Sequence, residues 1–237
     1  MNYQTYFQDV DSLSKLKRQT LAELYFKFYA GSDIGRFLAD LESKNEVLIL
    51  EHNREIVGFS SLQFYPDRDS VIVYSGDTIV MPEHWKQQAL HHAWIQRMGQ
   101  LKRDNPHRPL YWFLLVKGYK TYKYLVVFAK QFHPHWHSAQ PELKQLADRL
   151  AEQKFGPLYN QATGIVECPQ SYGYLSQALV DLDLQVKTKP SGQFFLQRNP
   201  RYYQGHEMVC LCEISLENLP NRFHSAFLNP AIEYRHE

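Results

Sequence analysis

Three things are scarce in this sequence: cysteine, net charge and long apolar runs. The 237 residues hold three cysteines, Cys168, Cys210 and Cys212, and no Cys-x-x-Cys pair. This excludes a disulfide framework and a zinc knuckle, and we expect reduced thiols packed inside the protein. The 26 Lys and Arg residues nearly balance the 25 Asp and Glu residues. No overall field therefore favours a nucleic acid or a membrane surface as partner.

Signals for membranes and secretion are missing too. The longest apolar runs, such as Tyr111 to Val116, reach about a third of the length of a membrane span. The first residues have neither a basic start nor an apolar stretch, so no signal peptide is visible. No Gly-x-Ser-x-Gly elbow, Walker loop or His-Glu-x-x-His motif is found. We expect a cytoplasmic protein outside those enzyme classes.

What the chain does have is aromatic side chains, with 16 Tyr, 14 Phe and 4 Trp making 14% of the residues. This content suits an aromatic-lined core or cleft and names no ligand. A chain of this length buries about three quarters of its unfolded surface, so it needs no metal or disulfide to fold. We expect one domain over residues 1–237.

Apolar spacing changes along the chain, and the change predicts the order of elements. The first half reads as helix, helix, hairpin, strand, helix, strand and helix. These elements are predicted at 12–29, 33–42, 46–51 with 55–65, 71–80, 82–102, 110–116 and 119–132. The second half is less regular, with a helix at 141–154, a loop at 156–172, a short helix at 174–181, a strand pair at 193–197 and 208–214, and a tail from Pro220.

This order, together with the run Gly76-Asp77-Thr78-Ile79-Val80-Met81-Pro82-Glu83-His84-Trp85, resembles the GNAT superfamily of N-acyltransferases. The resemblance implies an α/β fold with a mixed twisted sheet of the GNAT type and flanking helices. Residues 133–189 would be an insertion before the last strand pair. The implied activity is transfer of an acyl group from a thioester to an amine by direct attack.

The resemblance also implies where the acyl donor binds. The backbone of the strand end pairs with the pantetheine arm, and the following helix N-terminus receives the pyrophosphate because its N–H groups are free. The residues so implied are Ile79, Val80, Met81, Lys86, Gln87, Gln88 and Ala89. The family pattern Gln/Arg-x-x-Gly-x-Gly/Ala has no glycine here. Three alternatives remain: an acyl carrier protein as donor, a larger acyl-CoA bound differently, or a site no longer used.

Two catalytic residues are implied. Tyr124 would act as general acid toward the leaving thiolate, with Tyr119 and Tyr122 as substitutes, and Asp77 would act as base toward the amine. The simpler interpretations are aromatic packing for the tyrosines and, for Asp77, a hydrogen bond at a β-bulge beside Gly76. We expect no tightly bound cofactor, because acyl-CoA or acyl-phosphopantetheine would be a co-substrate.

Lysines and histidines suggest further partners. Lys117, Lys120 and Lys123 could form a basic stripe for an acidic acyl carrier protein or, less well, for RNA, and the simpler interpretation is a solvated face. His133-Pro134-His135-Trp136-His137 has His-x-His spacing, but no Cys or carboxylate is adjacent, so we predict a loop and no metal site.

The sequence thus predicts an N-acyltransferase that acts on a small-molecule or peptide amine. The insertion would shape the acceptor cleft with aromatic side chains, namely Trp136, Phe155, Tyr159, Tyr172 and Tyr174. The alternative is a binding or regulatory module that kept the fold and lost acyl-CoA binding.

Overall fold

The computed structural model describes residues 3–67, 69–184 and 188–236. The chain divides into two compact units. The first unit is Met1–Lys27, Ile34–Tyr111 and Ile214–Glu237, and the second is Phe28–Asp33 and Trp112–Glu213. No helix in the described ranges is long and apolar enough to cross a bilayer.

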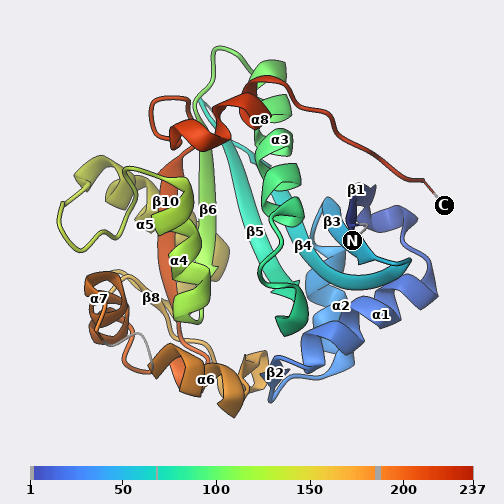
Figure 1. The fold of residues 1–237 in the computed structure, drawn as a ribbon. Coiled ribbons are helices and arrows are strands. Elements are labelled where there is room, and N and C mark those ends of the chain that lie inside the picture. The colour runs from blue at the N-terminus through green and yellow to red at the C-terminus, as the bar shows by residue number, and fades with distance from the viewer. Residues whose placement is uncertain (1–2, 68, 185–187, 237) are drawn as a thin grey trace. The chain divides into compact units, whose positions relative to one another are not determined.

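Four antiparallel strands form the sheet of the first unit, in the order β1-β3-β4-β5 (Figure 1). They are β1 (Tyr3–Asp9), β3 (Glu46–His52), β4 (Glu55–Pro66) and β5 (Val71–Val80). The β3–β4 turn contains Asn53 and Arg54 with φ angles of 53° and 68°, as a tight hairpin turn with a right-handed twist requires. The predicted hairpin is therefore confirmed.

Four helices belong to the first unit: α1 (Lys15–Phe26), α2 (Ile34–Glu42), α3 (Ala89–Asp104) and α8 (His224–Leu228). α3 packs against β1 and β3, and α1 packs against β4 and β5. α8 rests on α3 at Gly99, where an added Cβ would lie 1.9 Å from the Phe227 carbonyl oxygen. Because a backbone atom cannot rotate away, this packing requires glycine.

The C-terminal segment lies along the outer edge of β1. The Phe7 N–H donates to the Glu233 carbonyl at 2.8 Å, and the Arg235 N–H donates to the Phe7 carbonyl at 3.0 Å. Further toward the start of this segment, Ala231 is held by Gln96 of α3 instead of β1. The Gln96 side-chain amide donates to the Ala231 carbonyl at 3.3 Å and accepts from the Ala231 N–H at 3.2 Å. The tail predicted from Pro220 therefore has fixed hydrogen bonds on the sheet.

In the second unit the strand order is β6-β10-β8-β7, and a separate two-stranded sheet pairs β2 with β9. The strands are β2 (Tyr29–Ala30), β6 (Leu110–Val116), β7 (Tyr159–Asn160), β8 (Ile165–Val166), β9 (Tyr174–Leu175) and β10 (Glu207–Glu213). The helices are α4 (Tyr119–Phe128), α5 (Pro141–Phe155), α6 (Gln177–Leu184) and α7 (Pro190–Arg198). α5 packs against β10. All three cysteines are reduced and buried, as predicted.

Short 3-10 helices lie between these elements. They are η1 (Val10–Ser12), η2 (Pro82–His84), η3 (Gly156–Leu158), η4 (Gln170–Tyr172), η5 (Tyr202–Gln204) and η6 (Asn221–Phe223). η2 matters for the site, because the predicted helix at 82–102 is divided there: a 3-10 turn comes first and the α-helix begins at Ala89.

The α/β fold class is confirmed. The predicted helices and strands of the first 130 residues occur in the predicted sequence, with two further strands, β1 before the first helix and β2 between the first two helices. Strand β1 was not predicted, and the first helix begins at Lys15, with Ser14 as N-cap, rather than at residue 12. In the second half, the loop predicted at 156–172 contains β7 and β8, and the helix predicted at 174–181 is β9 followed by α6. The strand predicted at 193–197 is wrong, because these residues lie in α7. Pro190 at the first position of α7 starts a helix that buries Phe195.

Candidate functional site

A β-bulge interrupts β5 where the sequence places Gly76 and Asp77. Ser60 pairs with Thr78, and Leu62 pairs with Ser75, so that Ser61 stands opposite two residues of β5. An added Cβ on Gly76 would lie 2.5 Å from Ser61 Oγ and 2.6 Å from Lys44 Cε. An alanine at this position would fit only if the Ser61 and Lys44 side chains shifted, and the half-buried Asp77 follows Gly76. The bulge named as the simpler interpretation is present, and a catalytic role for Asp77 stays a prediction.

A buried lysine lies directly behind this bulge. Lys44, between α2 and β3, is 5% exposed. Its Nζ donates to Asp40 Oδ1 at 2.7 Å, to Ser43 Oγ at 2.9 Å and to the Asp40 carbonyl at 3.0 Å. It also lies 5.6 Å from the centre of the Tyr74 ring. Sequence reasoning missed Lys44, because a lysine just after a helix normally reads as a surface residue.

The end of β5 presents its backbone alternately to β4 and to the opposite edge. The Met81 N–H donates to the Val57 carbonyl at 2.9 Å, and Val80 stands opposite Gly58. In an antiparallel ladder the hydrogen-bonded and non-hydrogen-bonded pairs alternate. Val80 therefore directs its N–H and C=O away from β4. Its carbonyl accepts the indole N–H of Trp85 at 2.6 Å.

The turn between β5 and α3 holds the residues implied for phosphate binding. Lys86 and Gln88 are exposed, and Gln87 is half-buried. Gln87 Oε1 accepts the Leu90 N–H at 3.3 Å, so one amide of the first helical turn already has a partner. Burial lowers the pKa of His91, on the same turn, below its usual value, which keeps that imidazole neutral at pH 7. Side chains occupy this turn in place of the glycines of the family pattern.

The three candidate tyrosines lie in the second unit, on α4. Tyr119 and Tyr122 are buried: the Tyr119 hydroxyl lies 2.9 Å from Ser191 Oγ, and the Tyr122 hydroxyl donates to the Pro134 carbonyl at 2.8 Å. Both hydroxyls therefore already have partners inside the unit, which leaves Tyr124 as the candidate general acid. Its ring is partly exposed and stacks on Phe128 with centroids 6.1 Å apart.

Burial raises the pKa of Tyr124 to about 12. The phenol therefore keeps its proton throughout the physiological range and can act as a hydrogen-bond donor. Tyr124 belongs to one unit, and Asp77 with residues 79–89 belongs to the other. The structure thus brings Asp77 and residues 79–89 together within the first unit. Tyr124 is described within the second unit, and its part in the same site stays a prediction.

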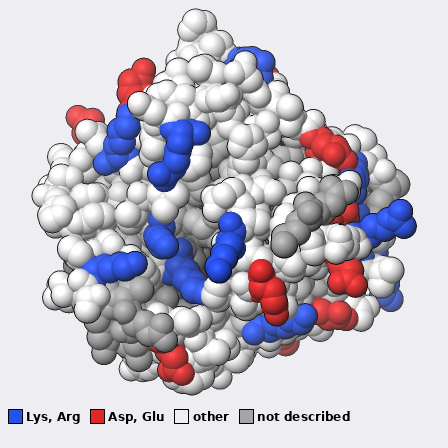
Figure 2. All heavy atoms as spheres, viewed as in Figure 1, with Lys and Arg blue, Asp and Glu red and all other residues white. Residues whose placement is uncertain are grey.

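The predicted basic stripe is wrong at Lys117. Its Nζ lies 2.9 Å from Glu207 Oε1, donates to the Gly173 carbonyl at 2.9 Å and stands 5.2 Å from the centre of the Tyr29 ring. Lys120 is half-buried and Lys123 is exposed. Both acidic and basic side chains appear on the face that Figure 2 shows. Lys123 is therefore the member of the set that can meet a partner.

The histidine segment packs as a loop. The backbone of His133 exchanges two hydrogen bonds of 2.8 Å with Leu211, and the His135 ring stacks on Trp136 at 4.1 Å and 18°. Within the described ranges, no three His, Cys, Asp or Glu side chains are placed to hold a metal ion.

Two of the five aromatic side chains expected to line an acceptor cleft, Phe155 and Tyr159, have separate partners in the second unit. Phe155 contacts Phe113 at 6.4 Å between ring centroids. The Tyr159 hydroxyl donates to Asp148 Oδ1 at 2.5 Å. A shared cleft stays a prediction.

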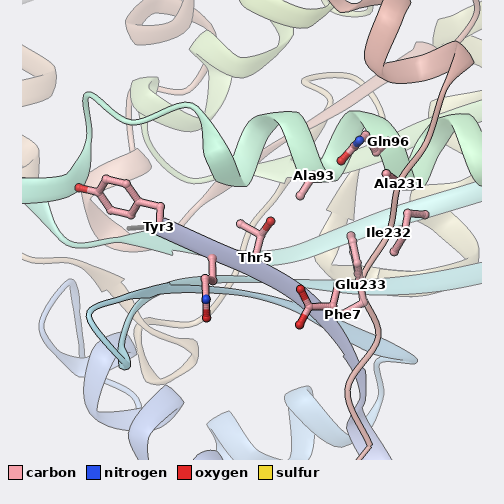
Figure 3. A pocket seen from close by; sticks show the side chains of 9 residues that line it. Tyr3, Thr5, Phe7, Ala93, Gln96, Ala231, Ile232 and Glu233 are labelled. Atoms are coloured by element: carbon pink, nitrogen blue, oxygen red, sulfur yellow. The ribbon is translucent and has the colours of Figure 1, made fainter. Parts of the chain in front are cut away.

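A crevice of about 300 Å³ lies elsewhere on the first unit, between β1, α3 and the C-terminal segment. Figure 3 shows Thr5 on the strand, Ala93 and Gln96 on the helix, and Ile232 on the tail around it. None of the predicted donor or catalytic residues lines this crevice. We therefore build the candidate site on β5 and the turn that follows it.

No family model matches the sequence, and no curated protein matches it either. Solved structures do match. One is an Enterococcus faecalis V583 protein described as a probable N-acyltransferase, with 10% identity, 56% of this chain and 33% of that chain covered, and a TM-score of 0.41. Another is the aminoglycoside N-acetyltransferase AAC(6')-Iy in complex with CoA, with 17% identity, 43% and 73% coverage, and a TM-score of 0.34.

A third is N-acetylglutamate synthase from Neisseria gonorrhoeae complexed with coenzyme A and N-acetyl-glutamate. It has 11% identity, 63% and 33% coverage, and a TM-score of 0.38. The chain spans about a third of the length of the first and third proteins. At these scores and identities, the matches carry no argument about the fold or the activity of this chain.

Proposed function

We propose that this protein is an N-acyltransferase that moves an acyl group from a phosphopantetheine thioester to an amine. The observation that supports the proposal most is the bulged strand β5, which leads through a short turn to the N-terminus of α3. The strand end offers backbone groups to an extended donor, and the helix start offers N–H groups to its phosphates. The donor is acyl-CoA or an acyl carrier protein.

The reaction is a direct attack. The amine nitrogen attacks the thioester carbonyl, the C–S bond breaks, and the amine loses a proton while the thiolate leaves. Asp77 takes the amine proton, directly or through water. Tyr124, with a pKa of about 12, is a weaker acid than a thiol of pKa about 8.5. Its role is therefore to donate a hydrogen bond to the developing thiolate rather than to protonate it fully.

The buried Lys44 supports the bulge that carries Asp77. Its Nζ lies only 3.6 Å from the position of an added Cβ on Gly76, and its charge is paired with Asp40 Oδ1 at 2.7 Å. The lysine therefore fixes the shape of the bulge, and proton removal from the acceptor is left to Asp77. A neutral amine is the form that attacks a thioester. The acceptor is a small-molecule or peptide amine.

The test of the mechanism is the release of free thiol from acyl-CoA, followed with a panel of amines. Tyr124→Phe should lower the turnover and leave the donor affinity unchanged. Tyr119→Phe is the matched control, because the Tyr119 hydroxyl lies against Ser191 inside the unit; it should affect stability more than turnover. Equal turnover for Tyr124→Phe and the wild-type protein would remove Tyr124 from the mechanism.

One set of observations favours a second function, a binding module without catalysis. The turn at 85–91 has no glycine, Gln87 occupies a helix amide and Trp85 occupies the Val80 carbonyl. A thermal-shift series separates the two functions. Saturation at 100 times Kd adds about 2.7 kcal/mol of stability. A donor that shifts the melting temperature without thiol release would favour the module.

A further inference from the structure

The Trp85 side chain is hydrogen-bonded to the backbone at the end of β5. Its indole N–H donates to the Val80 carbonyl at 2.6 Å, and its own backbone N–H donates to the Pro82 carbonyl at 3.3 Å. The turn of η2 thus folds the side chain back onto the strand from which it came. The residue is 38% exposed. It therefore lies against the strand end at a place that solvent and a ligand can reach.

The carbonyl that Trp85 covers is one that an extended ligand would use. Val80 directs its backbone away from β4, as the register with Gly58 and the Met81–Val57 hydrogen bond establish. A strand carbonyl that points away from its ladder partner can accept a hydrogen bond from an extended ligand that carries amides, and each amide supplies both a donor and an acceptor. An indole supplies a donor only. Trp85 satisfies the carbonyl and offers nothing to a strand N–H, so an amide is the better partner.

We infer that Trp85 is a reversible plug of the donor site, which an amide of the pantetheine arm displaces from the Val80 carbonyl. The inference rests on the proposed function and adds a specificity element to it. A ligand with the nucleotide part of CoA but no pantetheine leaves the plug in place. A ligand with pantetheine amides removes it.

The indole N–H signals in a nitrogen-15 NMR spectrum test this directly. Four tryptophans give four signals, Trp85, Trp94, Trp112 and Trp136, and Trp85→Phe assigns the first. We expect CoA to shift the Trp85 signal and to speed its hydrogen exchange about tenfold, the equivalent of one lost hydrogen bond. Adenosine 3′,5′-bisphosphate, which lacks pantetheine, should leave that signal in place.

The affinity of the variant gives a second readout. Trp85→Phe keeps an aromatic ring and removes the N–H, so CoA should bind about 2- to 10-fold more tightly, the range for one net hydrogen bond. Trp112→Phe, which changes a buried ring of the second unit, is the matched control and should leave the Kd unchanged. Binding by Trp85→Phe alone, with no binding by the wild-type protein, would also support the plug.

The remaining outcomes separate the two proposals. If CoA raises the melting temperature but neither moves the Trp85 signal nor binds more tightly to Trp85→Phe, the plug is wrong and the donor site stands. If neither protein binds CoA or an acyl-loaded carrier protein, the proposed function is wrong, and the plug falls with it because it has no ligand to exclude.

Discussion

Glu46 should be the most sensitive charged residue of the first unit. It begins β3 and is 3% exposed. Its carboxylate accepts from Arg97 Nε at 2.8 Å and Nη2 at 2.9 Å, on α3, and from the Tyr234 hydroxyl at 3.0 Å, on the C-terminal segment. One side chain therefore joins a strand, a helix and the tail. We take Glu46→Gln as the perturbation.

The loss of unfolding free energy expected for Glu46→Gln follows from the burial of Glu46 and Arg97. Burial lowers the pKa of Arg97, but the hydrogen bonds and charge of Glu46 more than offset this and leave the pKa raised. Glu46→Gln would keep the shape but leave that guanidinium buried without its counter-charge. Breaking a buried pair from one side costs about 3–5 kcal/mol. Because the glutamine oxygen still accepts one hydrogen bond, we expect about 3 kcal/mol, or a melting temperature about 6–12 °C lower.

Urea denaturation measures the free energy of unfolding of the wild-type protein and of four variants, namely Glu46→Gln, Arg97→Met, Tyr234→Phe and the double variant Glu46→Gln/Arg97→Met. Tyr234→Phe, which removes one hydrogen bond at a partly exposed ring, should cost about 1 kcal/mol. In Glu46→Gln/Arg97→Met the buried cation is gone, so the double variant should be more stable than the sum of the single changes predicts, by about 1–3 kcal/mol. Glu46→Gln could instead cost less than about 1 kcal/mol, or the two single changes could add fully in the double variant. Either result would show that Glu46 is not the counter-charge that stabilises the buried Arg97.

Three further outcomes can be measured. Gly76→Ala should destabilise the protein by about 1–3 kcal/mol in urea because its methyl group would overlap Lys44 and Ser61; a neutral effect would contradict the bulge packing. Burial lowers the pKa of His133 to about 4, so the unfolded chain binds more protons and the stability falls as pH drops from about 7 to 4. His133→Gln should flatten that dependence in melting curves, and an unchanged slope would count against it. Lys123→Glu, at an exposed position, should slow transfer from an acyl carrier protein and not from acyl-CoA; equal effects on both donors would exclude a carrier contact there.

The sequence predicts the central elements well because their signals are local. β5 and β6 have the predicted bounds, since each is an apolar run between turn residues. β1 was missed because its stability comes from the register with β3, some forty residues away. Residues 193–197 were misread because Phe194 and Phe195 look like strand residues, whereas Pro190 determines a helix.

In the candidate site too, features with a local sequence signal are predicted, and features that depend on tertiary contacts are missed. Gly76 beside Asp77 in an apolar strand signals a bulge, and the bulge is there. The spacing of residues does not predict the positions of Lys44 and Trp85, because both depend on tertiary contacts. The Lys44 side chain packs behind the bulge of β5, and the Trp85 side chain turns back to the Val80 carbonyl. Lys117 shows the reverse error: three-residue spacing predicts a surface stripe, but the ion pair with Glu207 holds it inside.

Thiol release from acyl-CoA and from an acyl-loaded carrier protein, each with and without an amine panel, decides whether this protein is an N-acyltransferase. We expect one donor class to release thiol only when an amine is present, with one amide formed for each thiol. If no donor releases thiol and none shifts the melting temperature, β5 and the start of α3 bind no thioester, and the proposed function is wrong.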